Sequence, residues 1–109
     1  LTSDYAPTAM YITENGAAYP DQLIGGKVDD PQRTAYLDAH VRAIHQAICA
    51  GAPLRGYFLW TLMDNFEWAH GYNQRFGIVY TDFPALTRIP KGSFHFYKQV
   101  IAQNGVGAG

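Results

Sequence analysis

The chain has 109 residues, of which 48% are hydrophobic and 16% are charged, so its composition is that of a globular protein rather than a disordered one. Its formal net charge is −1 and its lysines and arginines are scattered, so neither nucleic acid nor an anionic membrane is an expected partner. No apolar run approaches the ~20 residues that a membrane-spanning helix requires.

The first predicted element is a short strand over residues 9–13, AMYIT, which is apolar and rich in β-prone residues. The strand stops at Glu14 and at Asn15-Gly16, a strong turn signal. A charged residue at a strand end is common and often only solvated, so the role of Glu14 depends on the rest of the chain. The next segment, AAYPDQLIGGKVDDP, has the Gly, Pro and Asp content of a loop.

A helix is predicted over about residues 31–50. Asp30 suits its N-cap, Pro31 suits its first position, and Gly51 provides a natural stop. An apolar stripe at helical spacing runs along it, formed by Leu37, Val41, Ile44 and Ile48.

After the helix, the apolar run LRGYFLWTLM predicts a strand that is buried on both faces. A polar and aromatic loop, DNFEWAHGYNQR, follows it, and FGIVYTDF predicts a second short extended segment. Pro84 and Pro90 are expected to bracket a turn. Ser93 is expected to cap a last helix that reaches about Gln103.

The order strand, loop, helix, strand, loop, helix corresponds to two βα units, which form a parallel pair of strands with crossover helices. Two such strands leave both sheet edges and most apolar faces uncovered, so they do not make a complete α/β domain. A (β/α)8 TIM barrel contains eight such units, and its active site is built from the loops that follow the strands. The chain is therefore predicted to be about a quarter of such a barrel.

The second loop and its flanks combine aromatic rings with carboxylates, a combination that suits a sugar site. The apolar face of a pyranose stacks on an indole ring, while carboxylates accept hydrogen bonds from its hydroxyl groups. The alternative is that the rings belong to the core and the acids are solvated. The residues concerned are Trp60, Asp64, Glu67, Trp68, Tyr72 and Phe76.

Glu14, at the end of the preceding strand, favours the chemical interpretation. Glycoside hydrolysis commonly uses two carboxyl groups that flank the scissile bond. Glu14 and Glu67 can be such a pair, or one can be catalytic while the other binds sugar, and their spacing does not decide between these. Asp64 is interpreted as a residue that structures the loop through bonds to nearby backbone.

The histidines, the cysteine and the first residues of the chain indicate no further functional site. The four histidines include no pair at the i, i+4 spacing of a metal site, so no metal is expected. The single cysteine, Cys49, cannot form a disulfide within the chain, and the first residues lack the layout of a signal peptide. These features favour a reducing, cytoplasmic location. The start of the chain, which has no initiator methionine, suggests the middle of a longer protein.

The segments YITENG and GYFLWTLMDNFEWAHGYNQRFGIVYTDF, in this order and at this spacing, resemble the C-terminal quarter of family 1 glycoside hydrolases. The likeness extends from about Ala6 to Gln103 and includes DDPQRTAYLDAH and TRIPKGSFHFYKQVI. This family is the retaining β-glucosidase and β-galactosidase group. The resemblance implies that residues 1–109 are the C-terminal part of a single TIM-barrel catalytic domain, namely its strand-helix units 7 and 8.

The resemblance also implies a role for each matching residue. Glu14, in the family's TENG motif, is implied as the nucleophile that forms the glycosyl-enzyme. Trp60 is implied as the floor of the non-reducing sugar subsite, and Phe76 as an aromatic residue that lines the pocket near C6. Glu67 is implied to hold the 4- and 6-hydroxyl groups, and the indole N–H of Trp68 to reach a sugar hydroxyl.

The implied activity is the retaining hydrolysis of β-glucosides, with β-galactosides and β-fucosides as further candidates. Relatives that act on 6-phosphorylated glycosides lack an acid at the position of Glu67, because a carboxylate there repels the phosphate. An unphosphorylated glycone is therefore implied. No cofactor is implied.

The family's general acid/base lies in an NEP motif on an earlier strand, and this chain contains no such motif. The N-terminal remainder of the barrel is therefore an implied partner, and the chain alone is expected to be inactive. A non-catalytic sugar-binding protein, or a family member whose upstream acid has been replaced, is the alternative.

Overall fold

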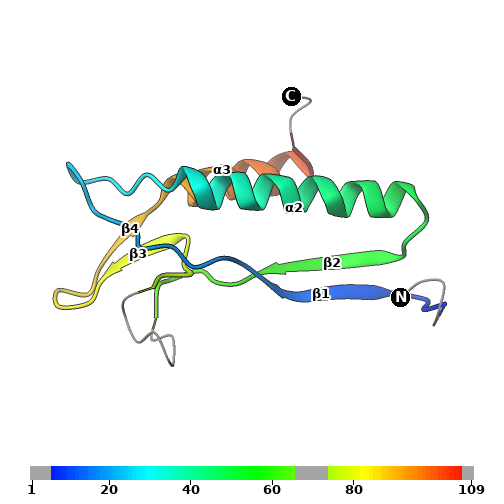
Figure 1. The fold of residues 1–109 in the computed structure, drawn as a ribbon, viewed down its shortest axis with the longest axis horizontal. Helices are drawn as coiled ribbons and strands as arrows, with labels where there is room; N and C mark the ends of the chain where they lie inside the picture. Colours follow the sequence, from blue (N-terminus) through cyan, green and yellow to red (C-terminus); the bar gives the residue numbers. More distant parts are fainter. Residues whose placement is uncertain (1–5, 66–73, 107–109) are drawn as a thin grey trace.

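The computed structural model describes residues 6–65 and 74–106. In chain order the described elements are β1 (Met10–Asn15), α2 (Pro31–Cys49), β2 (Leu54–Leu59), β3 (Val79–Asp82), β4 (Thr87–Pro90) and α3 (Gly92–Gln103). Both helices lie on one side of β1 and β2, and the β3–β4 hairpin lies at one end of the molecule (Figure 1).

Strands β1 and β2 are hydrogen-bonded neighbours that run parallel, with α2 connecting them, which confirms the predicted crossover unit. At one end of the pair the N–H of Met10 donates to the carbonyl of Pro53 at 2.8 Å. At the other end the N–H of Trp60 donates to the carbonyl of Asn15 at 2.9 Å. The carboxyl ends of the two strands therefore meet at the same edge.

Both strands differ in length from their predictions. β1 continues through Glu14 to Asn15, because Asn15 still pairs with Leu59 of the parallel partner. β2 ends at Leu59, four residues before the end of the apolar run. The remaining apolar residues change partner: the N–H of Val79 donates to the carbonyl of Leu62 at 2.8 Å, which ties this run to the start of β3.

A turn was predicted between Pro84 and Pro90, and the structure has a turn over residues 83–86, but the strand that follows it was not predicted. The structure contains strand β4 there, antiparallel to β3, with Val79 opposite Pro90 and Asp82 opposite Thr87. Pro90 is compatible with the strand because it is the last residue of a strand that has one hydrogen-bonded neighbour.

The helices have the predicted extents but different caps. Asp30 lies at the N-cap of α2, yet its side chain makes no cap hydrogen bond there. Its carboxylate instead accepts hydrogen bonds from the backbone N–H and the hydroxyl of Ser93, in the first turn of α3. Lys91, not Ser93, is the N-cap residue of α3. One carboxylate therefore joins the N-terminal ends of both helices.

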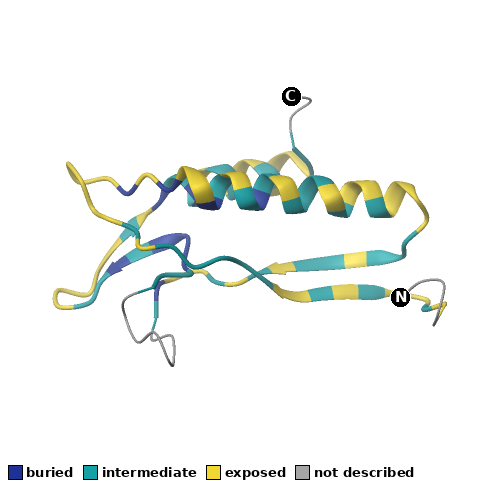
Figure 2. Ribbon diagram, viewed as in Figure 1, coloured by how far each residue is buried: buried dark blue, intermediate teal, exposed yellow. Residues whose placement is uncertain are grey.

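The buried residues are concentrated where the N-terminal ends of the helices meet the hairpin, while β1 and β2 stay partly exposed (Figure 2). On β1 and β2, Tyr11 and Phe58 are 60% and 59% exposed. The Cα radius of gyration is 15.7 Å, compared with ~13 Å for a compact domain of this size. The chain is thus an open piece of an α/β fold, as predicted.

Candidate active site

Glu14 lies in a β-bulge at the end of β1. Ile12 pairs with Tyr57 and Asn15 with Leu59, so β1 advances three residues where β2 advances two. The extra residue breaks the alternation of side chains along β1, and bulges of this kind redirect a side chain next to active sites. Glu14 is exposed as a result, whereas Asn15 is directed toward α2, where its amide contacts Tyr36.

Trp60 follows β2 at the same edge, directly beside the end of β1. A Cβ atom added to Gly16 would overlap the carbonyl oxygen of Trp60, so only glycine allows the two backbones to approach this closely. The indole residue is 39% exposed, which leaves ring surface available for contact. The approach brings the carboxylate position and the tryptophan position together, although they are 46 residues apart in sequence.

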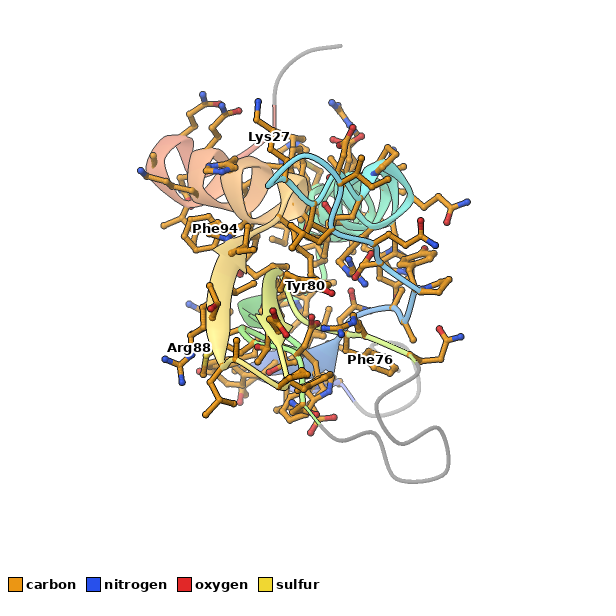
Figure 3. All side chains as sticks on the ribbon, turned by 90° about the vertical axis from the view of Figure 1, so that its left-hand side faces the viewer. Lys27, Phe76, Tyr80, Arg88 and Phe94 are labelled. Carbon is orange, nitrogen blue, oxygen red and sulfur yellow. The ribbon has the colours of Figure 1, made fainter. Side chains whose placement is uncertain are left out.

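Phe76 is brought to the same edge by backbone pairing. The N–H of Thr61, next to Trp60, donates to the carbonyl of Phe76 at 3.4 Å. One residue earlier, Arg75 and Tyr19 exchange two backbone hydrogen bonds of 3.0 and 3.1 Å. Phe76 lies on the sheet side of the molecule rather than among the helices (Figure 3). The structure therefore groups the backbone positions of Glu14, Trp60 and Phe76.

Glu67 and Trp68, the other two predicted site residues, lie outside the described residues. The two ends of their loop are described, and Asp64 joins them. Its carboxylate accepts hydrogen bonds from the backbone N–H of Gly77 at 3.0 Å and of Thr81 at 3.2 Å. Asp64 thus has a structural role, as predicted, but the backbone groups that it binds lie 13 and 17 residues away rather than nearby in sequence.

A buried cluster of three carboxylates and three cations adjoins this edge, and we call it the charge cluster. Its members are Asp21, Asp30, Arg33, Asp64, Arg75 and Lys91. At its centre, the fully buried Lys91 ammonium donates to Asp21 at 2.6 Å, to Asp64 at 2.9 Å and to the carbonyl of Gly77 at 2.6 Å. The three negative and three positive charges balance, and each ion has a partner of opposite charge, which offsets the cost of burying it.

Arg33 and Arg75 extend the charge cluster to both sides. Burial acts to lower the pKa of the Arg33 guanidinium, but its hydrogen bonds to Asp21 and Asp30 outweigh this effect, so the pKa lies above its usual value. Arg75 donates to Asp64 at 2.7 Å and its guanidinium carbon lies 4.1 Å from the ring centre of Tyr80. Only the pair of Asp30 and Arg33 has the local i, i+3 spacing, and the sequence offers no signal for the distant pairs, such as Lys91 and Asp21, which are 70 residues apart.

Comparison with known proteins identifies the family. Residues 1–106 match the family described as glycosyl hydrolase family 1. The chain belongs to this family.

Individual relatives support this family assignment. It is 52% identical over 106 residues to thermostable beta-glucosidase B of Thermobispora bispora, covering 97% of this chain and 22% of the relative. It is 46% identical over 93 residues to a 6-phospho-beta-galactosidase of Streptococcus equi subsp. zooepidemicus, covering 85% of this chain and 20% of the relative.

Among solved structures, the beta-glucosidase from Thermotoga maritima in complex with azafagomine matches the fold with a TM-score of 0.95 and 48% identity. The match covers 97% of this chain and 24% of that structure. The chain therefore spans about a quarter of the length of its relatives and corresponds to an α/β part of the family's TIM barrel.

Within the described residues, none of the helices is both long and apolar enough to cross a membrane.

Proposed function

We propose that the complete protein is a retaining β-glycosidase of the β-glucosidase type, which hydrolyses terminal non-reducing β-D-glucosyl residues. This chain would supply strand-helix units 7 and 8 of its barrel, the nucleophile and part of the sugar site. The observation that supports the proposal most is the position of Glu14. It is an exposed carboxylate on a bulge at the carboxyl end of a parallel strand, beside Trp60, in a family 1 chain.

The proposed reaction has two displacements. In the first, a carboxylate oxygen of Glu14 forms a bond to C1 while the bond from C1 to the aglycone oxygen breaks, and an acid outside this chain protonates that oxygen. In the second, water attacks C1 and gives a proton to the same outside group, which releases the sugar and frees Glu14. The second inversion at C1 restores the original β configuration.

The proposed sugar contacts come from the neighbouring positions. The exposed indole of Trp60 suits stacking on the apolar face of the glucosyl ring, and Phe76 lies near enough in the backbone to line the same pocket. From the sequence we further assign Glu67 to the 4- and 6-hydroxyl groups and Trp68 to a sugar hydroxyl. These two contacts would fix the orientation of the ring.

The proposed glycone is unphosphorylated, because the negative charge of Glu67 would repel a phosphate group on C6. The similarity to a 6-phospho-beta-galactosidase makes this distinction worth testing directly. An excess of activity on the 6-phosphorylated glucoside over the unphosphorylated one would contradict it.

The test requires the whole barrel. We define the assembled barrel as this chain carried in a full-length family 1 protein, either its own or the Thermotoga maritima beta-glucosidase with its matching quarter replaced. In this protein Glu14→Gln should lower the hydrolysis of an aryl β-glucoside by about 10⁴-fold or more, because the step that forms the glycosyl-enzyme is lost. Asp29→Asn, which neutralises an exposed carboxylate that belongs neither to the candidate site nor to the buried ion pairs, is the matched control and should retain activity.

Trapping separates a nucleophile from a binding residue. A slow-releasing fluorinated β-glucoside should label Glu14 covalently in the assembled barrel. With Glu14→Gly, added azide should restore turnover and yield an α-glucosyl azide, because azide then takes the place of the carboxylate at C1. Sugar binding without labelling would instead support a non-catalytic sugar-binding protein, and full activity of Glu14→Gln would refute the proposal.

A further inference from the structure

Both ends of the Asn15 side-chain amide are held by tyrosine hydroxyl groups. The hydroxyl of Tyr57 donates to Oδ1 of Asn15 at 2.8 Å, and Nδ2 of Asn15 donates to the hydroxyl of Tyr36 at 3.2 Å. Tyr57 belongs to β2 and Tyr36 to α2. We call these three residues the Asn15 clamp, which joins the end of β1 to a neighbouring strand and to a helix.

The two tyrosines of the clamp are themselves held. The Tyr36 ring stacks on the His40 ring, with centroids 3.9 Å apart, and Nδ1 of His40 lies 2.8 Å from the carbonyl oxygen of Tyr36. Burial, with smaller contributions from Tyr97 and Tyr36, raises the pKa of Tyr57 to about 12. The Tyr57 hydroxyl therefore keeps its proton and remains a donor to the amide.

The position of the clamp matters because of the bulge. The extra residue of β1 lies between Ile12 and Asn15, and the clamp fixes Asn15 on the side of α2. A strand with regular alternation would place Glu14 on the same side as Ile12, whose partner Tyr57 contacts the helix layer. The backbone N–H of Trp60, directly after β2, donates to the carbonyl of Asn15 and so also ties this end of β1 to β2.

We propose that Asn15 is a positioning residue, which holds the bulge through Tyr57 and Tyr36 and so directs Glu14 toward the sugar. This inference rests on the proposed function of Glu14 as nucleophile. The clamp should therefore affect bond formation at C1 more than it affects sugar binding, because it holds the residue that directly follows Glu14 and is not proposed to contact the substrate. Displacements of about 1 Å at a reacting group can lower a rate by ~10²-fold.

The experiment measures covalent trapping of the assembled barrel by the fluorinated β-glucoside. It determines the inhibition constant for reversible binding and the rate constant for glycosyl-enzyme formation separately. The variants are Asn15→Ala, Tyr57→Phe and their combination. The matched control is Tyr97→Phe, which removes the hydroxyl of a half-buried tyrosine. The ring centroid of Tyr97 lies 6.4 Å from that of Tyr57, but Tyr97 is not part of the clamp.

We expect Asn15→Ala to lower the trapping rate constant by roughly 10- to 100-fold, while the inhibition constant changes less than about two-fold. Tyr57→Phe should give a smaller loss in the same direction, and Tyr97→Phe should match the parent. Because Asn15 and Tyr57 act as a unit, the trapping rate constant of the combined variant should lie within about two-fold of that of Asn15→Ala.

Trapping rates of Asn15→Ala and Tyr57→Phe equal to that of the parent would overturn the proposal, as would an equal loss in Tyr97→Phe. A parallel rise of the inhibition constant would also overturn it, because that result indicates a general loss of the site. If Asn15→Ala does not fold, Tyr57→Phe alone decides, since it removes one hydroxyl and keeps the ring. Failure of the proposed function itself is distinguishable, because the parent would then not be labelled at Glu14.

Discussion

At the residue scale, a single hydrogen atom in place of a side chain allows the two halves of the site to meet. Gly16 passes the carbonyl of Trp60 at a separation that leaves no room for a Cβ atom. The positions proposed for the nucleophile, Glu14, and for sugar stacking, Trp60, therefore depend on a residue that does no chemistry. A glycine in an Asn-Gly pair is easily taken for a turn residue, and here its role is close packing of backbones.

Gly16→Ala tests this role in the assembled barrel. The added methyl group should push the end of β1 away from Trp60 and lower kcat/KM for an aryl β-glucoside by ~10²-fold through misplacement of Glu14. Gly105→Ala is the control, because a Cβ atom at Gly105 meets no atom within 4 Å, and it should leave kcat/KM unchanged. Unaltered kinetics in Gly16→Ala would show that the strand ends tolerate separation.

Residue identity predicted part of this site. The approach to Glu14 and the mixture of rings and acids near Trp60 are local patterns that suggested candidates, and the resemblance to family 1 glycoside hydrolases selected among them. The bulge was not predictable, because the register of β1 against β2 depends on pairing across 42 residues, as between Asn15 and Tyr57. The Asn15 clamp depends on the same pairing, so the sequence suggested only a turn there.

At the scale of elements, the charge cluster connects segments that the sequence presents as unrelated loops. Lys91 precedes α3, Asp21 follows β1, and Asp64 follows β2. The prediction of Ser93 as a helix cap failed for the same reason, since Asp30 reaches α3 from a distant part of the chain. Local capping rules describe a helix end in isolation, whereas here tertiary hydrogen bonds satisfy it.

Lys91→Met in the assembled barrel measures the contribution of the charge cluster. The substitution keeps much of the side-chain volume but leaves Asp21 and Asp64 without their shared cation, which should lower the free energy of unfolding by about 3–5 kcal/mol. The denaturant midpoint reports this change. Lys98→Met, on the exposed surface of α3, should change it by less than ~0.5 kcal/mol. Equal midpoints for the two variants would contradict the assigned role.

At the scale of the whole molecule, the fold class was predictable because the order of strands and helices is encoded by local patterns. The incompleteness of the sheet was predictable too, since a two-stranded parallel pair has two free edges. The hairpin strand β4 was not, because Pro84, before it, and Pro90, its last residue, favoured a turn. Its pairing with β3 outweighs that local preference.

The isolated chain is predicted to be inactive and loosely folded. Tyr11 and Phe58 are largely exposed to water, so the chain should bind a hydrophobic dye and unfold over a broad denaturant range. Addition of the N-terminal remainder of a family 1 barrel should abolish dye binding and restore the hydrolysis of an aryl β-glucoside. A sharp monomeric unfolding transition, together with hydrolysis by the chain alone, would contradict this prediction.

The charge cluster has a further consequence for recombination between family members. All six of its charged groups lie between Asp21 and Lys91, so a genetic crossover upstream of Asp21 transfers the entire set to a new host. A crossover between Arg33 and Asp64 divides the set, and each parent must then supply ions that match those of the other. Shuffled libraries of these barrels should therefore keep viable members at the first junction and lose, at the second, those members whose two parents differ in these ions.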